Sequence, residues 1–238
     1  MSIRNPKQAL YEQFAIVAKA LGHPLRLEMI EHLAQGARSV EALAVKLGQP
    51  VANISQHLQA LRRAGIVSAE RDGKFVYYAL ADESVLSAFA AVSGVAERQL
   101  AEVDRIVRGY FDARDDMQPV TREELQALMR DGLVTLIDVR PADEFALGHV
   151  PGAINVPLRE VRAWSADAAV GREIVAYCRG SWCVMSFEAV AALRSLGHSA
   201  RRLENGMPEW KAAGLPVEVA GLIVTNQTAR NAHARKGH

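Results

Sequence analysis

The sequence has few cysteines, few aromatic residues and no long apolar run. Among its 238 residues there are two cysteines, and aromatic residues make up 6%. Two cysteines are too few for a disulfide framework, which excludes a small secreted scaffold held by disulfides. No apolar run reaches the roughly 18 residues that span a bilayer, and charged residues and a proline interrupt the first twenty positions, where a signal peptide needs an apolar core. We therefore expect a cytoplasmic protein that does not associate with membranes and whose thiols stay reduced.

The chain is long and apolar enough to form two domains. Half of its residues are hydrophobic, and its net charge is only +1. Ten basic and six acidic side chains nevertheless occupy residues 1–78, whereas four basic and eight acidic ones occupy residues 79–118. After residue 118 the charge is nearly balanced and helical periodicity gives way to short apolar runs. This change predicts one domain over residues 1–118, a second over residues 119–219, and a polar, disordered tail over residues 220–238.

Apolar spacing and stop signals predict four helices in the first domain. They begin near Gln8, at Pro24, after the N-cap residue Ser39, and at Pro50. Gly48 ends the third helix and leaves a tight turn before the fourth. Two helices joined in this way are typical of a helix-turn-helix.

Two β-rich runs, residues 66–71 and 74–80, follow the fourth helix. Asp72-Gly73 joins them and can supply the positive φ angles of a type I′ hairpin turn. The pattern predicts a β-wing, and then a final helix that Asp82 caps and that continues to about Phe111.

The fourth helix carries polar side chains of the types that bind DNA. Asn and Gln pair with adenine edges, Arg pairs with guanine, and cations at a wing tip reach phosphates. The candidate DNA-binding residues are Asn53, Ser55, Gln56, His57, Arg62 and Arg63 on the helix, with Arg71 and Lys74 on the wing. A solvated helix face would explain these residues in an isolated helix, but the turn, the wing and the local positive charge favour DNA binding.

Three segments of this domain resemble the ArsR family of bacterial winged-helix repressors. They are ALGHPLRLEMI at residues 20–30, ISQHL at residues 54–58 and LRRAGIV at residues 61–67. The resemblance covers about residues 8–110 and implies a homodimer, formed through the first and last helices, that binds a palindromic double-stranded DNA operator until an inducer releases it. Many members sense metals through cysteines in the third helix or through Asp and His clusters in the last. Here the third helix lacks cysteine and residues 82–118 lack histidine, so we predict no metal site.

In the second domain, helical segments alternate with short apolar runs. A capping box at residues 121–124 opens a helix, and residues 134–139, 173–178 and 200–203 have the pattern of buried strands. This alternation predicts an α/β fold with a central parallel sheet. Ligands of such sheets bind at the carboxyl ends of the strands, and Cys178 lies at one of these ends.

The segment between that strand and the next helix is a candidate active-site loop. It consists of Cys178, Arg179, Gly180, Ser181, Trp182 and Cys183. Inward backbone N–H groups and the positive end of the helix dipole would stabilise an anion there, and would make Cys178 a nucleophilic thiolate. Arg179 adds a cation if its side chain turns inward. A Cys-x5-Arg phosphate-binding site is excluded, because the residue six positions after Cys178 is Val184.

This loop and five flanking motifs resemble the rhodanese sulfurtransferases over about residues 119–219. The flanking motifs are IDVRP at 137–141, EF at 144–145, GHVPGA at 148–153, NVP at 155–157 and LENGMPEW at 203–210. The resemblance implies that Cys178, without a cofactor, takes a sulfane sulfur from thiosulfate, a persulfide or a polysulfide and holds it as a persulfide. Asp138 and Arg140 match the family's strand-end acid and base, and a structural ion pair is the alternative. Cys183 departs from the family pattern: it either resolves the persulfide into a disulfide or a sulfur-bridged pair, or packs as a small apolar residue.

Together the two resemblances predict a repressor that senses or transfers sulfane sulfur through Cys178. The alternative is a sulfurtransferase enzyme whose DNA-binding domain the sulfur chemistry does not control. Steady formation of thiocyanate from thiosulfate and cyanide would favour the enzyme, and a single persulfidation without turnover would favour the sensor. A third hypothesis, binding of arsenic or another thiophilic ligand by Cys178 and Cys183, offers only two thiolates, an incomplete site.

Overall fold

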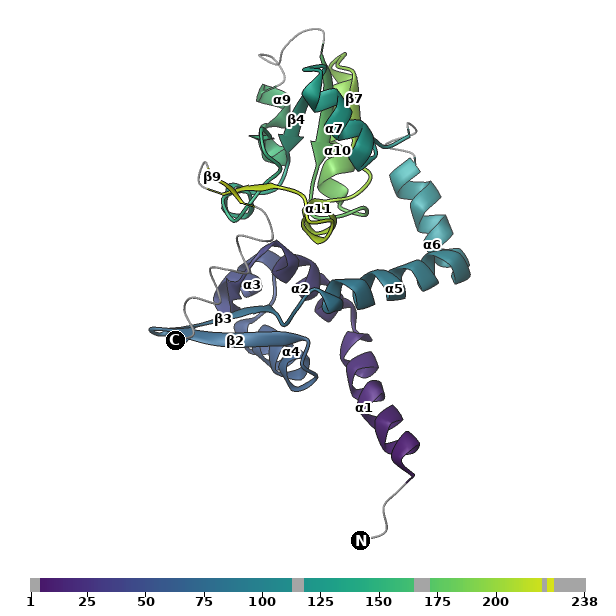
Figure 1. The fold of residues 1–238 in the computed structure, drawn as a ribbon, viewed down its shortest axis with the longest axis vertical. Helices are drawn as coiled ribbons and strands as arrows, with labels where there is room; N and C mark the ends of the chain where they lie inside the picture. Colours follow the sequence, from purple (N-terminus) through teal and green to yellow (C-terminus); the bar gives the residue numbers. More distant parts are fainter. Residues whose placement is uncertain (1–4, 113–117, 165–171, 220–221, 225–238) are drawn as a thin grey trace. The chain divides into compact units, whose positions relative to one another are not determined.

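The computed structural model describes residues 5–112, 118–164, 172–219 and 222–224. The chain forms two compact units, Met1–Arg98 and Gln99–His238 (Figure 1). None of the helices among these described residues is both long enough and apolar enough to cross a membrane.

The N-terminal unit is a winged helix-turn-helix, as predicted. Its helices are α1 (Pro6–Leu21), α2 (Pro24–Gln35), α3 (Val40–Leu47) and α4 (Val51–Arg63). The Ser39 side chain caps α3 by accepting a hydrogen bond of 3.2 Å from the Ala42 amide, and Gly48 ends α3 in the left-handed conformation at φ +60°. The fourth helix starts one residue later than predicted, because the backbone of Pro50 is extended and serves as the N-cap.

The core of this unit fixes which face of α4 is exposed. Ile54, Leu58 and Leu61 are fully buried and pack with Met29, Leu43 and other apolar residues of α2 and α3. Their spacing of three and four residues places them in one stripe. The polar side chains between them are therefore left on the outer part of the helix.

The wing is an antiparallel hairpin of β2 (Val67–Asp72) and β3 (Phe75–Leu80). Its two-residue loop is Gly73-Lys74 and not the predicted Asp72-Gly73, because Asp72 stays in the ladder opposite Phe75 and Gly73 takes its positive φ of +57° at the first loop position. A short strand that the sequence did not predict, β1 (Arg38–Ser39), pairs with the other edge of β3.

The helical segment after the wing is interrupted. Asp82 caps α5 (Ser84–Gln99) by accepting a hydrogen bond of 2.7 Å from the Ser84 amide, as predicted. The single helix predicted as far as Phe111 is wrong, because Leu100 is extended and separates α5 from α6 (Ala101–Ile106). A π-helix, η1 (Val107–Asp112), follows α6.

The C-terminal unit is an α/β fold around a parallel sheet, as predicted. Its strands β4 (Val134–Asp138), β5 (Ile154–Asn155), β6 (Glu173–Tyr177) and β7 (Ala200–Arg202) lie in the order β5-β4-β6-β7. The helices are α7 (Arg122–Arg130), α8 (Ala142–Phe145), η2 (Leu158–Glu160), α9 (Val161–Trp164), α10 (Val184–Ser195) and α11 (Met207–Ala212). Thr121 caps α7 by accepting a hydrogen bond from the Glu124 amide.

Both faces of this sheet are buried. Ile137, Ile174 and Ala176 pack with residues of α9 and α10 on one face. Leu136, Val175 and other residues pack with α7 and α11 on the opposite face. Burial on both faces explains why the strands are almost continuously apolar.

A two-stranded hairpin follows α11. Its strands are β8 (Val217–Val219) and β9 (Leu222–Val224). Strand β9 falls within residues 220–238, for which a disordered tail was expected. Residues 225–238 of that expected tail lie outside the described residues.

Candidate functional site

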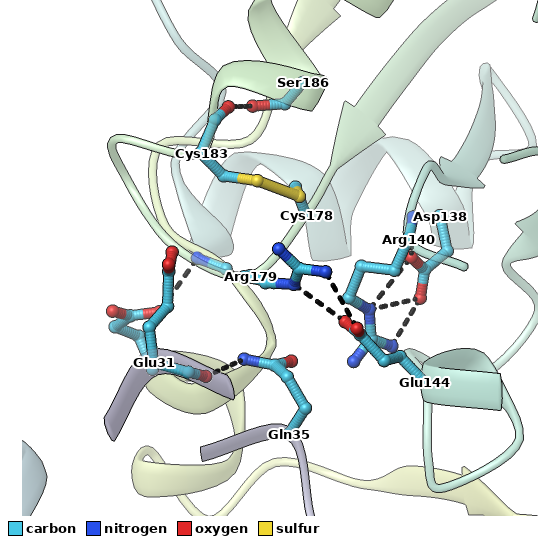
Figure 2. The surroundings of a disulfide bond; sticks show 11 residues. Glu31, Gln35, Asp138, Arg140, Glu144, Cys178, Arg179, Cys183 and Ser186 are labelled. Atoms are coloured by element: carbon cyan, nitrogen blue, oxygen red, sulfur yellow. Dashed lines mark hydrogen bonds and ion pairs between the residues drawn. A yellow bond between two sulfur atoms is a disulfide. The ribbon is translucent and has the colours of Figure 1, made fainter. Parts of the chain in front are cut away.

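The two cysteines close the loop between β6 and α10. Cys178 directly follows β6, Cys183 is the N-cap residue of α10, and their Sγ atoms form a disulfide (Figure 2). Both side chains are buried, with exposed fractions of 1% and 6%. The structure thus places the candidate nucleophile at the carboxyl end of a central strand, with Cys183 in bonding contact.

Hydrogen bonds hold the middle of this loop. The amide of Cys183 donates to the carbonyl oxygen of Gly180 over 3.1 Å, and the Ser181 hydroxyl donates to Oδ1 of Asn205 over 3.3 Å. These bonds attach the loop to its own helix and to the segment that precedes α11. The backbone of the loop therefore has a defined path around the cysteines.

Gly206 allows a close approach of two backbone segments behind the loop. A Cβ atom at this position would lie 2.3 Å from the backbone nitrogen of Gly180. The next residue, Met207, donates its amide proton to the carbonyl oxygen of Cys178 over 3.1 Å. Only glycine fits this position without displacing the loop.

The Arg179 side chain is paired with Glu144 of α8. Nε and Nη2 of Arg179 donate to the two carboxylate oxygens over 2.9 and 2.8 Å, and Glu144 is fully buried (Figure 2). Arg179 was expected to add a cation to the thiolate if its side chain turned inward, but the carboxylate neutralises its charge. Backbone N–H groups and the α10 dipole are left as the sources of thiolate stabilisation.

Glu144 is a residue whose role the sequence did not reveal. It belongs to one of the motifs that resemble the rhodanese family, but no residue near it in the sequence indicates its partner. Since 35 residues separate Glu144 from Arg179, only the fold brings the two side chains together.

Asp138 and Arg140 form a buried ion pair at the end of β4. Both side chains are fully buried, and Nε of Arg140 lies 3.0 Å from each carboxylate oxygen of Asp138. Arg140 also donates to the carbonyl oxygen of Gly148 over 2.9 Å. Burial by itself would lower the pKa of Arg140, but the hydrogen bonds and the charge of Asp138 outweigh it and raise that pKa. These contacts fix the end of the strand beside the cysteine loop.

Two further titratable groups are influenced by this ion pair. Burial, followed by the charge of Asp138, raises the pKa of Tyr177 well above its usual value, and the tyrosine hydroxyl accepts a hydrogen bond from the Val150 amide. Burial, followed by the charge of Arg140, lowers the pKa of Lys211 to about 8. Neither residue was a sequence candidate.

Trp182 is the exposed member of the loop. Its side chain is 42% exposed, and its ring lies edge-to-face against Phe111 at a centroid distance of 5.3 Å. From the sequence, Phe111 is predicted only to end a helix. No local signal marks it as a neighbour of the cysteine loop.

The candidate DNA-binding residues lie on α4 and on the wing. Five of them are exposed: Gln56, Arg62, Arg63, Arg71 and Lys74. Asn53 and Ser55 are half-buried, and the Asn53 side-chain amide donates to Oε1 of Gln49 over 3.0 Å. The structure brings most of this set to one helix face and one hairpin.

His57 differs from the other candidates on α4. Its ring packs against His23 at a centroid distance of 4.4 Å. Burial, followed by the charges of His23 and Arg26, lowers the pKa of His57. A neutral imidazole that packs against His23, the N-cap residue of α2, provides no cation for a phosphate at neutral pH.

Comparison with known proteins gives two family matches. A rhodanese-like domain matches residues 121–213, and a helix-turn-helix domain matches residues 21–68. The HTH-type transcriptional regulator Rv0324 of Mycobacterium tuberculosis is 44% identical over 212 residues, which cover 89% of this chain and 93% of the relative. The biofilm growth-associated repressor of Agrobacterium fabrum is 39% identical over 35% of this chain and 71% of its own. Among solved structures, the homodimeric winged helix-turn-helix DNA-binding domain Mb0332 of Mycobacterium bovis is 42% identical and covers 42% of this chain and 93% of that one, with a TM-score of 0.39.

Proposed function

The chain belongs to the ArsR-type helix-turn-helix transcriptional regulators that carry a C-terminal rhodanese-like domain. From this premise we propose that it is a repressor whose affinity for DNA changes when sulfane sulfur reacts at Cys178. The observation that carries the proposal is the bonded pair of Cys178 and Cys183 in the loop after β6. A cysteine that can close on the nucleophile turns a transient sulfur adduct into a lasting change of the loop.

The proposed chemistry has two steps. The Cys178 thiolate attacks the outer sulfur of a persulfide donor, R-S-SH; the donor S–S bond breaks, a thiol leaves, and Cys178 becomes a persulfide. The Cys183 thiolate then attacks Sγ of Cys178 and expels hydrosulfide, which forms the disulfide. Two protein thiols are oxidised, and the sulfane sulfur is reduced to sulfide. Reduction of the disulfide by a cellular thiol resets the loop.

The surroundings of Cys178 suit the first step. Cys178 directly follows the carboxyl end of β6, where ligands of parallel sheets bind, and its sulfur is bonded to Cys183 at the N-terminus of α10. The free N–H groups and the dipole at a helix N-terminus favour negative charge. The burial of Cys178 also keeps bulk water away from a persulfide. Because Arg179 is neutralised by Glu144, the loop depends on these backbone groups to hold an anionic adduct.

In the DNA-bound form, α4 would lie in a major groove, with the wing on the flanking phosphates. Gln56, Arg62 and Arg63 have the side-chain types that contact base edges and phosphates, and all three are exposed. Arg71 near the end of β2 and Lys74 in the wing loop are exposed as well. The exposure of these side chains supports the proposal that the domain binds a double-stranded operator.

A homodimer accounts for apolar side chains that α1 and α5 leave exposed. Tyr11 and Phe14 of α1 are 58% and 61% exposed, and Val92 and Val95 of α5 are 45% and 55% exposed. Phe14 and Val92 also line an apolar hollow of about 700 Å³. An exposed apolar surface of this kind is typical of an interface. A twofold dimer would present two α4 helices to the half-sites of a palindrome.

The experiment that tests the sulfur-sensing proposal compares DNA affinity in two chemical states. Full-length protein is titrated against DNA from its own upstream region by fluorescence anisotropy, either reduced or treated with polysulfide. We expect at least a fivefold change of Kd for the wild type and none for Cys178→Ser. The Cys183→Ser variant should retain the persulfide, detected as an added sulfur mass, without forming the disulfide. Equal Kd values for the wild type in both states would contradict the proposal, and rapid thiocyanate formation with unchanged Kd would favour the sulfurtransferase alternative.

A further inference from the structure

The last turn of η1 is packed onto the cysteine loop by aromatic contacts. Phe111 is 9% exposed, and its ring lies edge-to-face against both Trp182 and Phe187, at centroid distances of 5.3 and 4.7 Å. The neighbouring Tyr110 donates its hydroxyl proton to Oε1 of Glu188 on α10 over 3.1 Å. One helical turn thus contacts the loop and the helix that follows it.

The two aromatic partners of Phe111 differ in how firmly they are held. Phe187 is 1% exposed within α10, and the Arg202 guanidinium lies 4.3 Å from its ring centroid. Trp182 is 42% exposed and directly precedes Cys183, whose Sγ is bonded to Cys178. Opening the disulfide releases a restraint one residue from Trp182, whereas the core holds Phe187 in either state. Phe111 therefore contacts one ring that the core holds in place and one ring that belongs to the cysteine loop itself.

The π-helix η1, which carries Phe111, is suited to change its conformation when the cysteine loop changes. Residues 107–112 form a π-helix, a form that is rare in proteins and is frequently found at functional sites. The extended Leu100 already separates α6 from α5, so a shift of the short α6–η1 segment need not be absorbed within one rigid helix. In the chain, α5 and the winged helix-turn-helix precede this segment.

We propose that the contact between Phe111 and Trp182 transmits the chemical state of the cysteine loop to the α6–η1 segment, and that this contact couples sulfur chemistry to DNA binding. The inference rests on the proposed function and specifies how the same site is connected to the rest of the chain. Opening of the Cys178–Cys183 bond moves Trp182, changes the packing of Phe111, and alters η1. Coupling between two sites requires one element with two arrangements that both sites bias, and in the proposed coupling this element is η1.

The first test measures η1 directly and does not involve DNA. Amide hydrogen exchange is followed for residues 107–111 of the full-length protein, either reduced or with the disulfide formed. We expect at least a fivefold difference in exchange rate between the two states of the wild type. We expect no such difference in Trp182→Ala, and a retained difference in Trp182→Phe, which keeps an aromatic ring. Identical exchange in both states of the wild type would overturn the inference, whatever happens to DNA affinity.

The second test measures the ratio of Kd values for DNA in the two states. Phe111→Leu and Trp182→Ala should reduce the wild-type ratio to less than twofold, while mass spectrometry shows the same extent of Cys178–Cys183 disulfide formation as in the wild type. Leu196→Ala, an exposed apolar truncation at the C-cap of α10, is the matched control and should keep the ratio.

A full ratio in Trp182→Ala would overturn the inference and leave the proposed function intact. A ratio of one in the wild type would instead overturn the proposed function and, with it, this coupling to DNA. Because Trp182 is partly exposed, its variants still decide the matter if Phe111→Leu fails to fold.

Discussion

Glu144 holds the guanidinium of Arg179 through two parallel hydrogen bonds of 2.9 and 2.8 Å, from a position where the carboxylate is fully buried. This pair attaches Arg179, the residue next to Cys178, to α8. The charge of Arg179 therefore compensates the Glu144 carboxylate and is not available to a Cys178 thiolate. The loop is therefore anchored on one side by an ion pair and on the other by the close approach of Gly206.

Replacing Glu144 with Gln should destabilise the protein. Removing one partner of a buried ion pair leaves the other charge without compensation, and we expect the free energy of unfolding to fall by about 3 kcal/mol. The double variant Glu144→Gln/Arg179→Met should recover part of this loss, because it removes both charges. Urea denaturation measures both effects. A single variant within about 0.5 kcal/mol of the wild type, the range of ordinary surface substitutions, would show that the pair contributes little.

Gly206→Ala should disturb the cysteine loop. Its Cβ would lie 2.3 Å from the Gly180 nitrogen, so backbone must move, and overpacking of this kind costs about 1–3 kcal/mol. Reaction of Cys178 with polysulfide should slow as well. Gly180→Ala is a control in the same loop, because its Cβ would make only an ordinary contact of 3.6 Å with Oε1 of Glu209. Equal melting temperatures of the two variants would contradict this reasoning.

The titration of Lys211 should make the free energy of unfolding rise with pH between about pH 8 and pH 10.5. Its folded pKa of about 8 lies below the usual value of 10.5, so between these two pH values the unfolded chain binds more protons than the folded one, and stability increases with pH. Below pH 8 the lysine is charged in both states and the full cost of its burial remains. Lys211→Met should therefore be more stable than the wild type at pH 7, by up to roughly 3 kcal/mol.

The difference between Lys211→Met and the wild type should shrink as the pH rises from 8 to 10.5. Chemical denaturation of both proteins at several pH values measures it, and the comparison cancels groups that titrate alike in both. A difference that stays constant across this window would mean that the titration of Lys211 does not influence folding.

Substitutions on α4 should separate residues that contact DNA from those that do not. Arg62→Ala and Arg63→Ala remove exposed cations and should each weaken DNA binding by about tenfold, within the roughly 1–3 kcal/mol of a base contact. His57→Gln should change Kd less than twofold at pH 7.5, because the imidazole is neutral and packs against His23. Anisotropy titrations at fixed salt test all three variants. A tenfold loss in His57→Gln would place this side chain in the DNA interface.

The proposed dimer gives a separate prediction. Phe14→Glu puts a charge into the exposed apolar surface of α1, and it should convert a dimer into a monomer while α1 remains helical. Light scattering after size-exclusion chromatography measures the mass, and circular dichroism measures the helix content. Glu12→Gln, which alters a charge on the same helix, is the control. A monomeric wild type would rule out this interface.

The sequence alone determined the features that depend on neighbouring residues. Ser39, Asp82 and Thr121 each cap a helix through a hydrogen bond two or three residues away, so local spacing was enough to find them. Short apolar runs placed β4, β6 and β7 of the parallel sheet, though not β5, and a period of three to four residues placed the buried stripe of α4. The position of Cys178 at a strand end followed from the same patterns.

Only the tertiary structure decided which distant side chains meet. The pairing of Glu144 with Arg179 and the packing of Phe111 on Trp182 join segments far apart in the chain. His57 of α4 packs against His23, which directly precedes α2. The interruption of the helix at Leu100 likewise could not be predicted, because no glycine or proline lies at this position. Local hydrogen bonds and apolar periods are fixed by adjacent residues, whereas these contacts depend on how whole elements pack. The sequence therefore located the candidate active-site cysteine, and the fold determined which side chains surround it.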